Sequence, residues 1–230
     1  MSSSRKKTPL LPDIILFDLD GTLWRLPRLF TTLAGVWDKV KHNIRCAFGM
    51  KPAQTSAILP ASSVLIKPGV IVNFLYRILR PRTMPHAPEL LTHLNENGIM
   101  AGIVSNGPRR WGDFLLRKFS LSAHFAAASF RHNGIKPSPQ PLLDTVEQAT
   151  ITQDTAPKIV WLVGDRASDI HAALNAEKIQ NDYTVIPVAL GTNTKAAYTL
   201  KKLQRCGKAH SGLYFENYAS MLAYLKPRTP

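Results

Sequence analysis

With 230 residues, 45% of them hydrophobic, the chain is long enough for one large domain or for a core with a small insertion, and too apolar to be mostly disordered. No apolar run approaches the roughly 18 residues of a membrane span, so we expect no transmembrane segment. Basic residues outnumber acidic ones by 29 to 15, and the net charge of +14 leaves anionic partners open, nucleic acid among them.

The first predicted element is a strand at residues 14–17, where four apolar residues precede a turn that contains Gly21. Asp18 and Asp20 follow this strand directly, at the end where open α/β sheets bind their ligands. Crowded carboxylates repel each other unless a cation or a proton relieves them. The pair therefore predicts an Asp nucleophile and an Asp acid/base beside a divalent metal, although Asp and Gly after a strand can also form a plain turn.

Residues 24–83 predict a helical insertion after the first strand. Apolar residues at steps of three and four indicate a helix over 29–48, and a second apolar stretch over 69–80 ends before Pro81. The segment 24–83 contains ten basic residues and one acidic residue, so +9 of the net charge is concentrated there. This charge either attracts a polyanionic substrate or only solubilises two helices with large apolar faces.

From residue 84 onward, strands and helices alternate. The pattern predicts helices near 87–97, 111–119, 141–149 and 169–176, strands at 99–104, 126–130, 158–163 and 185–190, and a short strand and a helix within 211–225. Such alternation is typical of a parallel sheet with right-handed crossovers. We therefore predict an α/β fold, a three-layer Rossmann-like core formed by 10–23 and 84–230. Trp37, Trp111 and Trp161 lie on apolar faces and are predicted to be core residues.

Polar residues recur at the predicted strand ends. Ser105-Asn106 follows one strand, Lys136 lies in Gly-Ile-Lys-Pro, and Gly164-Asp165 ends another strand, with Asp169 one helical turn further on. Alone, Ser-Asn could cap a helix and Lys136 could be a solvated surface lysine. Together with Asp18-Leu19-Asp20-Gly21-Thr22, and in this order, the segments resemble the motifs of the haloacid dehalogenase (HAD) superfamily, and the resemblance spans nearly the whole chain.

The resemblance implies roles for the two leading carboxylates. Asp18 would attack phosphorus and form an aspartyl-phosphate, for which a carboxylate needs no prior deprotonation at neutral pH. Asp20 would protonate the departing alcohol and then activate water. Because a departing halide needs no proton, an acid at Asp20 favours phosphate chemistry over dehalogenation.

The resemblance also implies ligands for the metal and the phosphate. Mg²⁺ would be held by the carboxylates of Asp18 and Asp165, the backbone carbonyl of Asp20, and Asp169, which completes or orients the shell. The hydroxyl of Ser105 and the amide of Asn106 would bind phosphate oxygens, and Lys136 would hold the nucleophile and the phosphoryl group together. Arg166 departs from the family pattern, in which a small hydroxylated residue is more common, and we expect it to point to solvent.

The function implied is that of a Mg²⁺-dependent phosphatase for a small phosphorylated metabolite, close to the phosphoglycolate-phosphatase branch, with residues 24–83 as a cap over the site. A phosphomutase would use the same residues. A catalytically idle module that binds nucleic acid or an acidic partner is the alternative from another class. The basic N-terminus is not followed by a signal-peptide core, so we expect a cytoplasmic protein with reduced cysteines.

Overall fold

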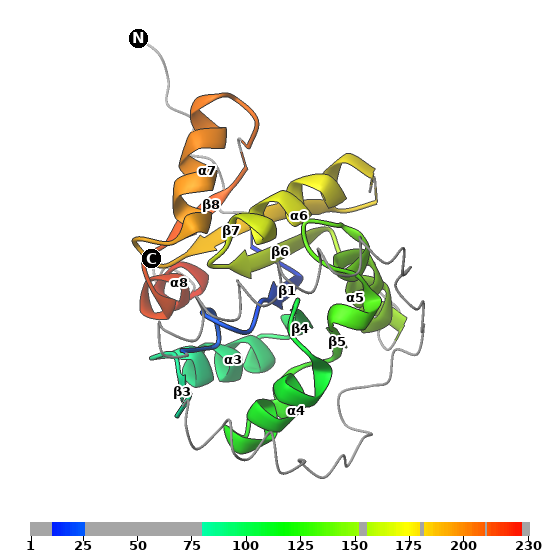
Figure 1. The fold of residues 1–230 in the computed structure, drawn as a ribbon, viewed down its shortest axis with the longest axis vertical. Coiled ribbons are helices and arrows are strands. Elements are labelled where there is room, and N and C mark those ends of the chain that lie inside the picture. Colours follow the sequence, from blue (N-terminus) through cyan, green and yellow to red (C-terminus); the bar gives the residue numbers. More distant parts are fainter. Residues whose placement is uncertain (1–10, 26–79, 152–155, 180–181, 210, 227–230) are drawn as a thin grey trace, which may run out of the picture.

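A computed structural model describes residues 11–25, 80–151, 156–179, 182–209 and 211–226 (Figure 1). Its centre is a six-stranded sheet in the order β5-β4-β1-β6-β7-β8, in which every neighbouring pair is parallel. The strands are β1 (Ile14–Phe17), β4 (Met100–Val104), β5 (Ala127–Ser129), β6 (Ile159–Gly164), β7 (Thr184–Leu190) and β8 (Leu213–Phe215). The predicted α/β fold with a parallel sheet is thereby confirmed.

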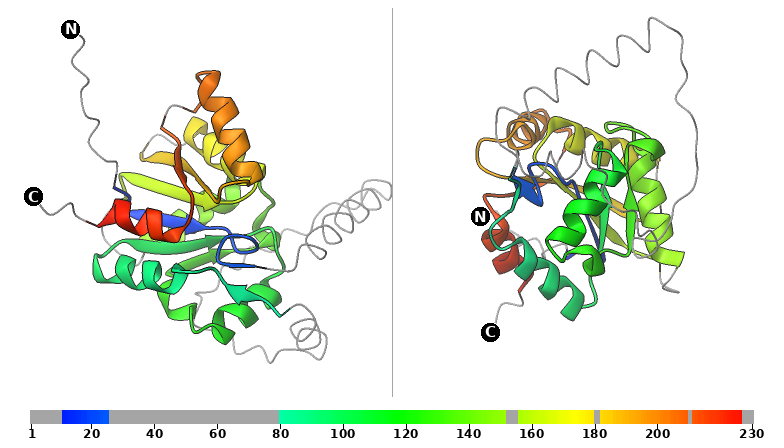
Figure 2. Two further views of the ribbon diagram at one scale, coloured as in Figure 1. Left: turned by 90° about the vertical axis from the view of Figure 1, so that its left-hand side faces the viewer. Right: turned by 60° about the horizontal axis from the view of Figure 1, so that its bottom comes forward.

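Strand β1 is wholly buried because helices cover both faces of the sheet (Figure 2). Ile15 and Phe17 face the core beneath one helical layer, and Ile14 and Leu16 face the opposite core. The first layer consists of α3 (Ala87–Glu96), α4 (Arg109–Lys118) and α8 (Tyr218–Leu225). The second consists of α5 (Gln140–Ile151) and α6 (Ala167–Ile179), with α7 (Lys195–Arg205) packed beside α6 and β7.

The order of the strands brings several loops together at the carboxyl ends of the sheet. From β1 the sheet extends through β4 to β5 on one side and through β6 to β7 and β8 on the other. Crossovers that diverge from a central strand leave an opening above it, and open α/β sheets bind ligands there. The loops that follow β1, β4, β5 and β6 therefore meet at one place.

The described elements from residue 84 onward agree with the predicted ones to within a few residues. Helix α4 begins two residues earlier than predicted, at Arg109, with Pro108 in extended conformation as its N-cap. Helix α7 was not predicted. Nor was the two-stranded antiparallel ribbon of β2 (Trp24–Arg25) and β3 (Arg82–Thr83), which lies beside the turn after β1.

The predicted helices 29–48 and 69–80 lie outside the described residues, so the cap and its limits at 24 and 83 stay predictions. Within the described part of the chain, no helix combines the length and the apolar character needed to cross a bilayer.

Candidate active site

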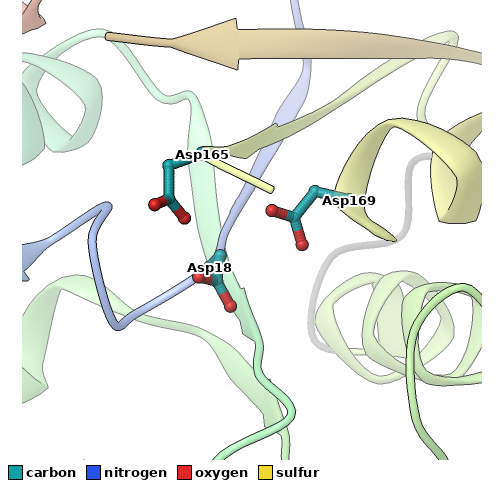
Figure 3. A group of neighbouring side chains, drawn as sticks. All are labelled: Asp18, Asp165 and Asp169. Carbon is teal, nitrogen blue, oxygen red and sulfur yellow. The ribbon is translucent and has the colours of Figure 1, made fainter. Parts of the chain in front are cut away.

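Three carboxylates converge above the centre of the sheet (Figure 3). Asp18 directly follows β1, Asp165 directly follows β6, and Asp169 lies in the first turn of α6. One oxygen from each of these three residues lies within 4.8 Å of the other two. The pairing of β1 with β6 produces this approach, because it aligns Phe17 with Val163 and so brings the two strand ends together.

Lys136 ties two of these carboxylates together. Its Nζ lies 2.7 Å from Asp18 Oδ1 and 2.7 Å from Asp169 Oδ1, and it donates a further hydrogen bond of 2.7 Å to the carbonyl of Val104. An ammonium group has three donors, and all three have a partner here. Burial lowers the pKa of Lys136, but the charges of Asp169 and Asp18 outweigh it and raise the pKa above its usual value. The lysine is therefore a permanent cation in the site.

One oxygen of the Asp165 carboxylate lacks a hydrogen-bond partner in the described part of the chain. Its Oδ1 is buried and receives no hydrogen bond from the described residues. Burial, followed by the charges of Asp18 and Asp169, raises the pKa of Asp165 to about 7. A buried carboxylate oxygen without a donor is costly, so this one is suited to a cation that is not part of the protein.

Two glycines make room for these carboxylates. A Cβ on Gly21 would collide with the Asp165 carboxylate, and the φ of 93° at Gly21 is one that other residues rarely adopt. A Cβ on Gly164 would likewise collide with the side chain of Asp169. At both positions the backbone approaches the carboxylate more closely than a residue with a Cβ would allow.

The donor set fits Mg²⁺. The group consists of carboxylate oxygens alone, which is what a hard cation prefers, and no described residue donates a competing hydrogen bond to Asp165 Oδ1. The group does not include the carboxylate of Asp20. The sequence predicted that Asp20 binds the metal through its backbone carbonyl, and this role stays a prediction because the group contains side-chain oxygens only.

Asp20 is instead held by aromatic residues. Trp24 Nε1 donates a hydrogen bond of 2.6 Å to Asp20 Oδ1, and both Trp24 and, to a smaller extent, Trp111 lower the pKa of this carboxyl group. Burial raises the pKa of Asp20, and the charge of Asp18 adds to the rise against the two tryptophans and Arg166. Asp20 consequently retains a proton to higher pH than an ordinary aspartate, as a general acid requires.

The residues after β4 form a buried turn beside these carboxylates. Ser105 is 4% exposed, and its Oγ accepts a hydrogen bond of 3.1 Å from the N–H of Gly107. The side chain of Asn106 bonds the backbone of Lys136 at both ends: Oδ1 accepts from its N–H at 2.8 Å, and Nδ2 donates to its carbonyl at 3.2 Å. Asn106 therefore orients the lysine, a role that the sequence did not suggest.

Arg166 has an exposed side chain, as predicted, but it is not independent of the site. Burial of part of the group lowers the pKa of Arg166, yet the charges of the four aspartates, Asp18 first, raise it overall. Its backbone N–H also donates to Asp169 Oδ2 at 2.9 Å. The guanidinium is thus a cation at the rim of an acidic site.

Sequence reasoning missed Trp24 and treated Trp111 only as a core residue. The available signal was the spacing of four residues from Asp20 to Trp24 across a Gly-containing turn. With that spacing the indole can reach the carboxylate only if the chain reverses direction between the two residues. The hydrogen bond of 2.9 Å from the N–H of Gly21 to the carbonyl of Trp24 shows this reversal.

The comparisons with known proteins agree with this geometry. The family model of the haloacid dehalogenase-like hydrolases matches residues 12–177. This range includes every site residue from Asp18 to Asp169. No curated protein sequence matches the chain.

Solved structures with the same fold come from several bacteria. A HAD-superfamily hydrolase from Ehrlichia chaffeensis is 21% identical, with 94% of this chain and 96% of that chain covered and a TM-score of 0.55. A predicted phosphoglycolate phosphatase from Haemophilus somnus is 20% identical, with 93% and 98% covered and a TM-score of 0.58. CbbY from Rhodobacter sphaeroides, solved with phosphate, is 15% identical, with 94% and 99% covered and a TM-score of 0.54. These likenesses show the fold, and the family model, which spans most of the chain, shows that the protein belongs to the haloacid dehalogenase-like hydrolases.

Proposed function

We propose that this hydrolase is a Mg²⁺-dependent phosphatase that releases phosphate from a small phosphorylated metabolite through an aspartyl-phosphate on Asp18. The observation that carries the proposal is the convergence of Asp18, Asp165 and Asp169 within 4.8 Å, with Lys136 bound to two of them. A nucleophilic carboxylate and an anionic phosphate repel each other, so the reaction needs cations at this point. Lys136 is one such cation, and the oxygens of the three aspartates would hold the other.

Each residue has a distinct task. Asp18 forms a bond to phosphorus while the bond from phosphorus to the alcohol oxygen breaks, and the proton of Asp20 passes to that oxygen. In the second half, Asp20 takes a proton from water as the water oxygen binds phosphorus and the bond to Asp18 breaks. Bound Mg²⁺ would supply charge neutralisation and orientation of the phosphate oxygens.

The phosphate oxygens have candidate donors around them. The Ser105 hydroxyl and the backbone N–H of Asn106 lie in the turn after β4, and Lys136 Nζ is already next to the nucleophile. Lys136 is kept in place by the two bonds from the Asn106 side chain. Asn106→Ala should therefore disturb the position of the lysine as well as phosphate binding.

The test is a panel of phosphoesters assayed with Mg²⁺, with a chelator, and with Asp18→Asn. We expect metal-dependent phosphate release that Asp18→Asn lowers by on the order of 10³-fold or more, since removal of a nucleophile has effects of that size. Asp144→Asn is the matched control, because Asp144 lies on α5 and, among the described residues, its side chain bonds that of Gln140 alone. Full turnover by Asp18→Asn would refute the proposal.

The same assay separates the alternatives. Transfer of the phosphoryl group to a second hydroxyl of the substrate, without release, would identify a phosphomutase. The absence of both activities, together with retained binding of an oligonucleotide or an acidic protein, would identify a catalytically idle binding module.

A further inference from the structure

Trp24 packs directly against the general acid/base, and the local backbone dictates this contact. The N–H of Trp24 bonds the carbonyl of Leu19 at 3.4 Å, and the carbonyl of Trp24 accepts from Gly21 at 2.9 Å. The chain therefore doubles back over four residues and places the indole on the Asp20 carboxyl group, 2.6 Å from Nε1 to Oδ1. The Trp24 ring is fully buried and rests on Phe119, with 6.1 Å between ring centroids.

We propose that Trp24 is a positioning residue that determines which oxygen of Asp20 carries the proton delivered to the leaving group. The inference rests on the proposed function, because it assigns Asp20 as the acid. An indole N–H can only donate, so Asp20 Oδ1 must act as an acceptor whenever this hydrogen bond is present. The carbonyl oxygen of a carboxylic acid is a better acceptor than its hydroxyl oxygen, so in the acid form this bond favours the proton on Oδ2.

The other oxygen of Asp20, Oδ2, faces the turn after β4. The position that a Cβ of Gly107 would occupy is 3.8 Å from Asp20 Oδ2 and 3.2 Å from Ser105 Oγ. Oδ2 thus points toward the turn at residues 105–107, to which we assign the phosphate oxygens. With Trp24 on Oδ1, the proton is favoured on the oxygen next to that turn and not on the one bonded by the indole.

A neutral donor is suited to a group that works in two protonation states. A lysine or arginine on Oδ1 would strongly favour the charged carboxylate. The indole of Trp24 can bond Oδ1 of the acid and of the carboxylate alike, so the orientation of Asp20 is retained in both halves of the reaction. Trp111 makes a smaller contribution that also lowers the pKa of this carboxyl group.

The experiment compares Trp24→Phe with the parent protein on two substrates, an alkyl phosphate and p-nitrophenyl phosphate. An alkoxide needs a proton in order to leave, whereas p-nitrophenolate is stable without one. We therefore expect kcat/KM for the alkyl phosphate to fall on the order of 10- to 100-fold, and for p-nitrophenyl phosphate less than about 3-fold, within the usual range of acid catalysis. For both substrates KM should stay close to the parent value.

Trp161→Phe is the matched control. The Trp161 ring is as completely buried as that of Trp24, but its Nε1 has no hydrogen-bond partner among the described residues. This variant makes the same change of ring and loses no bond to a catalytic group. The ratio of kcat/KM for the alkyl phosphate to kcat/KM for p-nitrophenyl phosphate should therefore equal that of the parent protein. Trp111→Phe changes a half-buried side chain and should shift the ratio in the same direction as Trp24→Phe, but less. It decides the question if Trp24→Phe does not fold.

If Trp24→Phe lowers kcat/KM by the same factor for both substrates, or lowers neither, the ratio of the two values is unchanged and the positioning role is overturned. Asp18→Asn and Asp20→Asn, measured beside these variants, separate this result from failure of the proposed function. If Asp18→Asn is inactive and Asp20→Asn is selectively impaired on the alkyl phosphate, the phosphatase proposal stands whatever Trp24→Phe does. If Asp18→Asn is fully active, the phosphatase proposal itself fails.

Discussion

Lys136 allows two buried carboxylates to lie side by side in this protein. With side-chain exposures of 8% for Asp18 and 0% for Asp169, neither carboxylate has enough water to screen their repulsion. The lysine bonds one oxygen of each, and the N–H of Arg166 donates to the other oxygen of Asp169, so the second oxygen of Asp18 and the carboxylate of Asp165 are the ones left for a second cation. The site thus contains one fixed positive charge among its carboxylates, with the Arg166 guanidinium at its rim, and by our proposal it acquires a metal cation from solution.

Asp165 makes the stability of the metal-free protein depend on pH. Its pKa is raised to about 7 in the folded chain, from 3.8 for an ordinary aspartate, because of burial and the charges of Asp18 and Asp169. The folded state therefore binds a proton that the unfolded state has released, and this stabilisation is lost as the pH rises from about 4 through about 7. Bound Mg²⁺ replaces the proton, so the metal should stabilise most above pH 7.

The measurement is the thermal midpoint with and without Mg²⁺ at pH 5.5 and at pH 8. We expect the increase on addition of Mg²⁺ to be several degrees larger at pH 8, as a coupling of about 1 kcal/mol or more would give. In Asp165→Asn the difference between the two pH values should shrink, because Asn cannot take up a proton. An equal increase at both pH values in the parent protein would contradict the prediction.

The proximity of Asp18, Asp165 and Asp169 could be expected from the sequence. Asp18 and Asp165 follow neighbouring strands of one parallel sheet, whose ends can be located from apolar runs, and Asp169 lies one helical turn after Asp165. The contact between Asn106 and Lys136 joins residues 30 positions apart, and it depends on the path of the loop after β5. No local pattern encodes such a path, so this contact could not be predicted.

Among the elements, the turn after β1 is connected to the C-terminal helix. The hydroxyl of Tyr218, in the first turn of α8, donates a hydrogen bond of 3.1 Å to the carbonyl of Thr22. Both residues are almost fully buried, so this carbonyl has no access to bulk water. Helix α8 therefore holds the turn that carries Gly21 beside Asp165.

Tyr218→Phe should lower the free energy of unfolding by about 1–2 kcal/mol, the usual cost of a buried carbonyl that loses its donor. It should also weaken Mg²⁺ binding, since the turn beside Asp165 is no longer fixed. Chemical denaturation and metal titration measure the two effects. Tyr224→Phe is the control, because Tyr224 lies on the same helix and packs its ring on Phe215, with no hydrogen bond from its hydroxyl among the described residues. Equal effects of the two variants would show that the bond to Thr22 is unimportant.

Three of the described elements, α7, β2 and β3, were missed, for two different reasons. In helix α7 the apolar residues Ala196, Leu200 and Leu203 recur at steps of four and three, so this helix was within reach of its sequence pattern and was overlooked. Strands β2 and β3 have two residues each and pair across 56 intervening positions, and so short a pairing leaves no alternation to detect. The long buried strands, in contrast, were predicted to within one or two residues.

At the scale of the whole molecule, an acidic site lies in a strongly basic chain. The net charge is +14, and +9 of it belongs to residues 24–83, most of which lie outside the described residues. The outer side of α7 is also basic, with Lys201, Lys202 and Arg205 exposed and no acidic residue in the helix. A field of this sign attracts anions, so it should raise the rate at which phosphorylated substrates reach the site.

We therefore expect kcat/KM to fall as the salt concentration rises, and to fall more for a substrate with two phosphate groups than for one with a single group. Between 20 and 300 mM NaCl the loss should be about 10-fold for the former and about 3-fold for the latter, with kcat nearly constant, because salt screens long-range attraction and not the bound contacts.

Two triple variants locate the source of the attraction. Replacement of Lys39, Lys41 and Arg45 by Gln removes three charges from the segment 24–83, and replacement of Lys201, Lys202 and Arg205 by Gln removes three from α7. If the predicted cap steers the substrate, the first variant should lose most of the salt dependence and the second should retain it. The opposite result would assign steering to α7. Salt dependence that is flat and equal for both substrates would show that the charge only solubilises the protein.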